Sequence, residues 1–269
     1  MSAAGLLRRV AQRVRHFPGL RRLDPLWRLA RGPYLKLLRR MSPSGVPVTI
    51  AGTPLRLDAD FATQNWETVE AEAYSAFASR VRPGARIVDV GAHIGTYTLI
   101  AALRAGASGR VMAFEPEADT RAALLRHLEW NAVGPRVIVR DCCCGAQAGT
   151  AKFYFRKGAE GMNSLLPTAG FGERVVTVVR LDDEIEALGG APDLVKVDVE
   201  GAEFEVLRGA EQTLRRHHPV LLLSLHPGPL GRLGSSEAEI LAWLAGLGYA
   251  TRVLARDYEV HVLAEVAQP

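Results

Sequence analysis

The chain has 269 residues, of which 48% are apolar and 23% charged, and its formal net charge is +4. This length allows one large domain with an appendage, and the composition is ordinary for a globular protein. The sequence lacks both the run of about 18 apolar residues that crosses a membrane and the apolar segment of a secretory signal. We therefore expect a cytoplasmic protein.

The positive charge is concentrated in a leader. Residues 1–44 contain 11 of the 33 basic residues and one of the 29 acids, a net charge of +10, which leaves −6 for the remainder. An acidic body gives no reason to expect nucleic-acid binding. We predict a basic helical leader over 1–45 and a main domain over 46–269, with its core at 82–265 and an insertion at about 150–180.

The leader has an amphipathic pattern. Over 6–17 the apolar residues fall on one side of a helix and the basic residues on the other, and a second apolar and basic stretch covers 26–40. Such a leader can lie peripherally on an anionic membrane, dock on a partner, or pack on its own domain. A cleaved organelle transit peptide is a weaker alternative.

Strands and helices alternate after the leader. Apolar patterns bounded by turn residues predict strands at 48–50, 55–57, 86–90, 111–114, 136–140, 194–197, 220–225, 250–254 and 259–263. Helical periodicity predicts helices at 65–80, capped by Asn65, and at 96–104, 117–131, 202–216 and 236–247. The insertion adds an antiparallel pair at 152–155 and 175–179. This order indicates an α/β, doubly wound, Rossmann-like fold with a mostly parallel sheet.

A glycine turn after the strand at 86–90 predicts the cofactor site. A dinucleotide site would show G-x-G-x-x-G, whereas this turn reads G-x-x-x-G with an acid before it. The acid would repel a pyrophosphate, while the free N–H groups of the following helix favour the carboxylate of S-adenosylmethionine. The glycines would let that ligand approach the backbone closely. The predicted cofactor residues of this turn are Asp89, Gly91, His93, Gly95 and Thr96.

Two further acids complete the predicted cofactor site. Glu115 ends the second strand of the alternating part, where an acid can accept hydrogen bonds from both ribose hydroxyls. Asp141 ends the third, where the adenine would lie, although Cys143 or Cys144 could make that contact instead. The three adjacent cysteines, Cys142 to Cys144, cannot supply the spaced ligands of a zinc site, so we expect a strand end in a reducing compartment.

The run 193–203 predicts the chemical site, because acids and a lysine cluster where a strand ends and a helix begins. Asp198 and Glu200 would face the same way in an extended chain, toward a substrate hydroxyl or a divalent metal ion. Glu203 is expected to complement the dipole of the next helix. His226 ends the neighbouring strand, so Asp198 and His226 are the candidate catalytic bases.

Five segments in this order carry a resemblance to a known family: the glycine turn, Phe114-Glu115-Pro116, 161–165, 180–183 and 196–203. Together they resemble FkbM-family methyltransferases over roughly residues 82–227. The resemblance implies the class I methyltransferase fold, whose seventh and last strand is antiparallel. It also implies S-adenosylmethionine-dependent transfer of a methyl group to a hydroxyl of a sugar, glycan or natural product.

Two positions depart from the family pattern. His93 replaces an asparagine, and Ser224 stands where a glutamate is more common. Asn163 and Ser164 are candidate substrate contacts, or they cap a turn. Two other functions stay open at this point: a non-catalytic methyltransferase-like module that binds a membrane or partner, and, less favoured, a nucleotide-dependent dehydrogenase.

Overall fold

A computed structural model describes residues 4–8, 24–66, 68–155, 165–167 and 169–266. Most of the first predicted helix of the leader, and the candidate substrate residues Asn163 and Ser164, lie outside these ranges. Among the described helices, none combines the length and the apolar character that a bilayer crossing requires.

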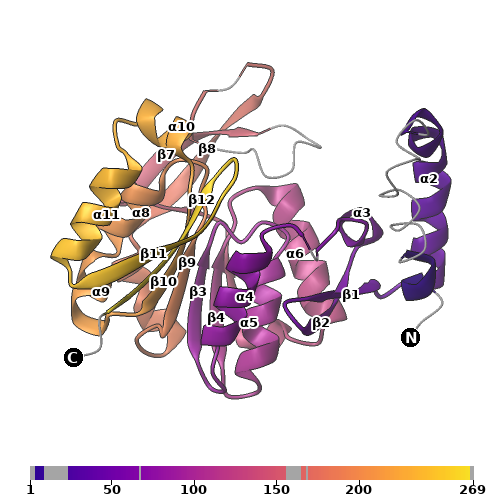
Figure 1. Ribbon diagram of the computed structural model, residues 1–269, viewed down its shortest axis with the longest axis horizontal. Helices are drawn as coiled ribbons and strands as arrows, with labels where there is room; N and C mark the ends of the chain where they lie inside the picture. The colour runs from indigo at the N-terminus through magenta and orange to yellow at the C-terminus, as the bar shows by residue number, and fades with distance from the viewer. Residues whose placement is uncertain (1–3, 9–23, 67, 156–164, 168, 267–269) are drawn as a thin grey trace.

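A seven-stranded sheet forms the centre of the molecule (Figure 1). Its strands, from one edge to the other, are β11 (Tyr249–Arg256), β12 (Val260–Val266), β10 (Val220–Leu225), β9 (Leu194–Val197), β3 (Arg86–Val90), β4 (Arg110–Phe114) and β5 (Val137–Arg140). Every neighbouring pair is parallel except the two pairs made by β12, which runs antiparallel to both β10 and β11. The predicted mostly parallel sheet with an antiparallel last strand is confirmed.

Helices cover both faces of this sheet (Figure 1). One layer contains α4 (Ala71–Arg80), α5 (Thr96–Ala105) and α6 (Ala118–Trp130), and the other contains α8 (Glu203–Gly209), α9 (Glu211–His217) and α11 (Glu237–Gly246). Successive residues of β3 enter different cores, because side chains alternate along a strand. Ile87 belongs to the core of the first layer, and Val88 and Val90 belong to the core of the second.

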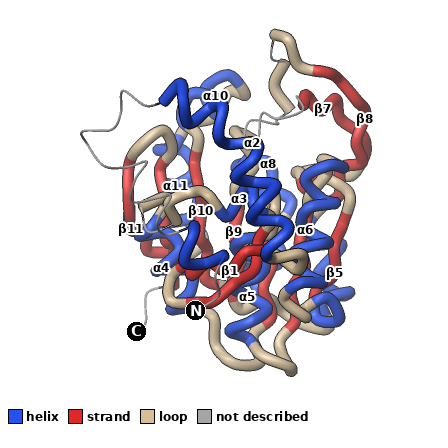
Figure 2. The backbone as a smooth tube through the Cα atoms, turned by 90° about the vertical axis from the view of Figure 1, so that its right-hand side faces the viewer, coloured by secondary structure: helices blue, strands red, loops and turns tan. Residues whose placement is uncertain are grey.

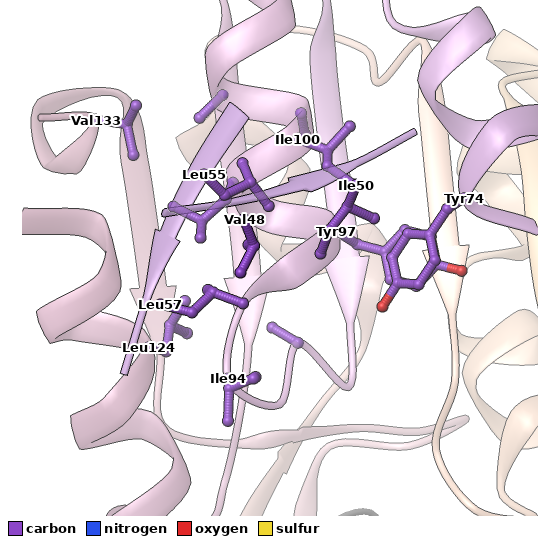
Figure 3. Packing of buried hydrophobic residues seen from close by; sticks show 14 of the residues in the cluster. Val48, Ile50, Leu55, Leu57, Tyr74, Ile94, Tyr97, Ile100, Leu124 and Val133 are labelled. Carbon is purple, nitrogen blue, oxygen red and sulfur yellow. The ribbon is translucent and has the colours of Figure 1, made fainter. Parts of the chain in front are cut away.

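A hairpin of β1 (Val46–Ile50) and β2 (Thr53–Leu57) extends the first core. Its inward residues pack with Ile94, Ile100 and Leu124 (Figure 3). The leader helix α2 (Asp24–Met41) lies outside this hairpin and α3 (Ala59–Ala62) (Figure 1, Figure 2), and it buries Leu35 and Leu38 in the same core.

The insertion forms a separate small sheet. Its strands β7 (Gly149–Phe155) and β8 (Gly172–Val179) pair antiparallel, as predicted, and β6 (Cys143–Cys144) adds a third strand parallel to β8. The β7–β8 pair lies at the same end of the molecule as α10 (Pro227–Arg232), which follows the carboxyl end of β10 (Figure 1, Figure 2). The insertion therefore stands near the edge where ligands of such sheets bind.

Two predicted helix boundaries are wrong. The helix expected from Asn65 begins only at Ala71, because Glu70 just before it has a left-handed backbone, with φ of +47°, which a continuous helix cannot contain. The single helix expected over 202–216 is two helices. The first, α8, ends at Gly209, where an added Cβ would lie 2.0 Å from the carbonyl oxygen of Gly145.

Candidate functional site

A cavity of about 270 Å³ opens at the carboxyl ends of the central strands. Residues that follow β3, β4 and β9 form much of its wall, together with the segment before α4 and with β6. The predicted site residues that line it are Gly91, His93, Thr96, Glu115, Asp198 and Glu200. Because ligands of doubly wound sheets bind at this edge, the cavity is the candidate active site.

Glu115 presents a buried carboxylate on the cavity wall. Its Oε2 accepts the backbone N–H of His93 and its Oε1 accepts that of Glu117, each at 2.8 Å. Each oxygen keeps further acceptor capacity, so the carboxylate can still accept two hydroxyl hydrogens from a ligand. Burial raises the pKa of Glu115 to about 7, although the two backbone N–H groups act in the opposite direction.

The raised pKa of Glu115 predicts that S-adenosylmethionine binding depends on pH. If Glu115 binds the ribose, as the sequence leads us to expect, only its ionised form can accept both hydroxyls, and that form is lost as the pH falls through about 7. The Kd of the wild type should therefore rise about 10-fold between pH 8 and pH 6. Glu115→Gln should bind more weakly at pH 8, and its Kd should lack this 10-fold dependence on pH. Titration calorimetry on both proteins therefore isolates the contribution of Glu115 to the pH dependence. Parallel pH profiles for the two proteins would contradict the assignment.

The two turn glycines are required by packing. Both have positive φ, +79° at Gly91 and +89° at Gly95. An added Cβ would lie 1.7 Å from the backbone oxygen of Asp198 at Gly91, and 2.3 Å from the Leu124 side chain at Gly95. Contacts with β9 and α6 are therefore enough to require both glycines, and the close approach of a ligand to their backbone stays a prediction. His93 also has positive φ, +51°, a conformation that asparagine adopts readily.

Asp89 lies in β3 just before the turn and is not part of the cavity wall. It is fully buried, and its Oδ2 accepts the hydroxyl of Thr98 at 2.6 Å. Burial raises the pKa of Asp89, with Lys196 acting in the opposite direction. The predicted direct contact with the cofactor is corrected, because the carboxylate is held inside the sheet layer.

Asp141 is exposed and lies outside the cavity wall, whereas Cys142, Cys143 and Cys144 all line it. The chain turns at the end of β5 so that the cysteines face inward and the aspartate faces solvent. Burial raises the pKa of Cys142 to about 11 and that of Cys143 to about 12, so these thiols are neutral. The alternative in which the cysteines replace Asp141 at the adenine position fits the structure.

Lys196, which is buried, and Asp198, which is partly exposed, form an ion pair between β9 and the cavity. The Lys196 Nζ lies 2.9 Å from the Asp198 Oδ2 and 4.6 Å from the ring centre of Tyr97. That ring stacks on Tyr74 (Figure 3). Burial would raise the pKa of Asp198, but Lys196 and His226 outweigh it and lower the pKa. Asp198 is therefore ionised at neutral pH.

Four carboxylates surround His226, which is buried behind the cavity wall. Its Nδ1 lies 2.8 Å from the Glu203 Oε1, within hydrogen-bonding distance. Its Nε2 lies 3.5 Å from both the Glu200 Oε2 and the Glu259 Oε2, and 3.9 Å from the Asp198 Oδ1. The predicted convergence of Asp198, Glu200 and His226 thus occurs, around the Nε2 atom.

These charges affect the two candidate bases differently. Burial alone would lower the pKa of His226, but Glu203 and the other carboxylates raise it to about 9. A protonated imidazole cannot accept a further proton, so the arrangement of side chains favours Asp198 over His226. Glu200 also has positive φ, +53°, and burial with neighbouring acids raises its pKa to about 8. Strained backbone of this kind is concentrated at functional sites.

Three residues of this cluster were not expected from the sequence. Glu203 is fully buried and binds both His226 and the Gly201 N–H, so its expected role as a simple dipole complement is corrected. Glu259 immediately precedes the last strand, and His261 lies in it, paired in register with Ser224. The signal for them is two ionisable residues at the start of a run that is otherwise apolar and buried as far as Ala264.

The strand order and the cavity at the strand ends define the class I methyltransferase architecture, and comparison with known proteins identifies the family. A model of the methyltransferase FkbM domain matches residues 89–251. The chain belongs to the FkbM methyltransferase family.

Several relatives share part of this chain. The 31-O-demethyl-FK506 methyltransferase FkbM of Streptomyces tacrolimicus is 33% identical over 65% of this chain and 76% of its own. The methyltransferase sdnD of Sordaria araneosa is 31% identical over 47% of this chain and 60% of its own. The hexuronic acid methyltransferase AglP of Haloferax volcanii is 30% identical over 52% of this chain and 55% of its own. The chain therefore spans little more than half the length of two of these relatives.

Among solved structures, the methyltransferase FkbM of Methylobacillus flagellatus is 17% identical. It aligns with a TM-score of 0.47 over 77% of this chain and 62% of its own.

Proposed function

We propose that this protein is an S-adenosylmethionine-dependent O-methyltransferase that methylates a hydroxyl of a sugar, glycan or natural product. The observation that carries the proposal is that two acids, from the ends of different strands, line the same cavity. Glu115 offers acceptor oxygens suited to a ribose, and Asp198 offers an ionised carboxylate suited to an acceptor hydroxyl.

The cavity fits the cofactor in three respects. Glu115 would hold the ribose hydroxyls, and the cysteines at 142–144 would lie against the adenine. The backbone of the turn at 91–95 and the start of α5 would bind the methionine carboxylate, since helix N-termini favour anions. When bound, S-adenosylmethionine supplies a methyl group that is already activated for transfer. The enzyme must then only align the acceptor oxygen and accept its proton.

Asp198 is the residue that we assign to the acceptor hydroxyl. Lys196 holds its carboxylate in one orientation and keeps it ionised. Glu200 lies beside it on the same wall and would contact the acceptor as well. The names of two relatives refer to an oxygen of FK506 and to a hexuronic acid, which supports a polyhydroxylated acceptor.

Methyl transfer can be tested with S-adenosylmethionine that carries a trideuteromethyl group. The protein would be incubated with a panel of uronic acid glycosides and macrolide alcohols, and the products analysed by mass spectrometry and NMR. We expect a trideuteromethyl ether on one acceptor class. Transfer to nitrogen or carbon instead, by a protein that binds the cofactor, would contradict the O-methyltransferase assignment.

We further propose a cytoplasmic location, in keeping with three unpaired cysteines at the cofactor site.

The burial of Leu35 and Leu38 supports a leader that packs on its own domain. Leu6 and Leu37 remain exposed and would be available for peripheral membrane contact. Sedimentation with anionic vesicles, before and after Leu37→Glu, separates the two roles of the leader.

A further inference from the structure

The cluster around His226 has donor atoms spaced like the ligands of a metal ion. One atom each from Asp198, His226 and Glu259 lies within 4.8 Å of the other two. The distances from the His226 Nε2, 3.5 Å to Glu259 and 3.9 Å to Asp198, are longer than hydrogen bonds. Ligands about 2.1 Å from a common ion lie roughly 3.0 to 3.5 Å apart, and further apart at wide angles.

A buried oxygen without a partner points into this cluster. The Glu259 side chain is 1% exposed, yet its Oε2 has no hydrogen-bond partner among the described residues. A buried carboxylate oxygen that accepts no hydrogen bond is costly, whereas coordination of a cation in place of the imidazole proton would satisfy it. This oxygen is the one that lies 3.5 Å from the His226 Nε2.

The other side of His226 is arranged as in metal-binding histidines. Its Nδ1 bonds to the Glu203 Oε1 at 2.8 Å, and the same oxygen accepts the Gly201 N–H at 2.9 Å. A histidine that binds a metal through one nitrogen usually donates its other N–H to a carboxylate, which fixes the ring. The hydrogen bond from Nδ1 to Glu203 therefore directs the Nε2 toward Asp198 and Glu259.

The donor set indicates the class of ion. One imidazole nitrogen with two carboxylates suits Mn²⁺, Fe²⁺, Co²⁺ or Zn²⁺, whereas Mg²⁺ and Ca²⁺ prefer oxygen ligands alone. Glu200 is a fourth donor, with its Oε2 3.5 Å from the His226 Nε2. Because Asp198 and Glu200 also line the cavity, an ion here would border the acceptor space.

We infer that His226, Asp198 and Glu259 bind one divalent transition-metal ion beside the active-site cavity. The ion lies on the side of Asp198 opposite Lys196, since Lys196 occupies one carboxylate oxygen and His226 faces the other. The position of the ion relative to an acceptor hydroxyl rests on the proposed function, but the binding of the ion does not.

Titration with Co²⁺ tests this site, because cobalt reports its own coordination by visible absorption. Protein stripped with a chelator should bind one equivalent of Co²⁺ with a saturable d–d band. His226→Gln and Glu259→Gln should each weaken binding by about 100-fold or more, since even the outer partners of metal-binding histidines contribute about 10- to 100-fold. The matched controls His217→Gln and Glu239→Gln, both on exposed positions, should bind like the wild type.

The wild type provides a second measurement that does not depend on the folding of variants. Saturating Co²⁺ should raise its melting temperature, and a chelator should reverse the rise, because the ion binds only the folded site. An unchanged melting temperature with no saturable band would overturn the inference, as would ligand variants that bind like the wild type. Both measurements omit S-adenosylmethionine. A protein that binds this cofactor but not Co²⁺ would therefore overturn the metal site and leave the proposed function intact.

Discussion

Replacement of Asp198 by asparagine is expected to reduce turnover by about 100-fold or more, the contribution typical of a positioned acid or base. The change removes the charge but keeps the shape and an oxygen that can still accept the Lys196 Nζ. Asparagine can neither accept the acceptor's proton nor act as an anionic metal ligand. Affinity for S-adenosylmethionine should stay close to that of the wild type, because the proposed function assigns cofactor binding to Glu115 and the turn.

The measurement combines steady-state kinetics with titration calorimetry and a thermal melt. Asp183→Asn is a matched control, since Asp183 is exposed and is not part of the cavity wall. It should retain wild-type turnover. A folded, fully active Asp198→Asn enzyme would remove Asp198 from the chemistry. A parallel loss of cofactor affinity and turnover would instead assign Asp198 to cofactor binding.

Gly91→Ala is expected to lower the free energy of unfolding by about 2–5 kcal/mol. The left-handed backbone costs a non-glycine residue about 1–2 kcal/mol, and crowding a packed interior adds about 1–3 kcal/mol. Here the crowding is severe, because the new Cβ would lie 1.7 Å from the Asp198 carbonyl oxygen. The clash would displace the end of β9, so activity should fall together with stability.

Gly52→Ala separates the two causes. Gly52 has a similar φ of +74°, but an added Cβ there would meet nothing within 4 Å. Denaturant unfolding should show a loss of only about 1–2 kcal/mol for this variant. Equal losses of unfolding free energy at Gly52 and Gly91 would show that crowding against the end of β9 does not contribute at Gly91.

The sequence predicted most of the sheet because its strands are short apolar runs separated by turn residues. β3, β10 and the β7–β8 pair lie close to their predicted ranges. The cavity edge was also predictable, since glycine turns and acids at strand ends mark it. Glu115 and Asp198, two of the acids at strand ends, both line the cavity.

The remaining features depend on contacts between distant segments. Glu259 reaches His226 only because β12 inserts between β10 and β11, a pairing that local periodicity cannot specify. The close approach of Gly91 to Asp198 likewise depends on the register of β3 against β9. The inward or outward direction at Asp141 depends on how the chain turns after β5. In each case a neighbour far along the sequence determines the role of the residue.

Titration calorimetry with S-adenosylmethionine and with NAD tests the central claim most directly. The wild type should bind one S-adenosylmethionine per chain and show no heat of binding with NAD. Glu115→Ala should weaken the cofactor affinity by about 1–3 kcal/mol, the usual cost of leaving buried polar partners unpaired. Binding of NAD, or of neither ligand, by a folded wild-type protein would contradict the assignment of this cavity to S-adenosylmethionine.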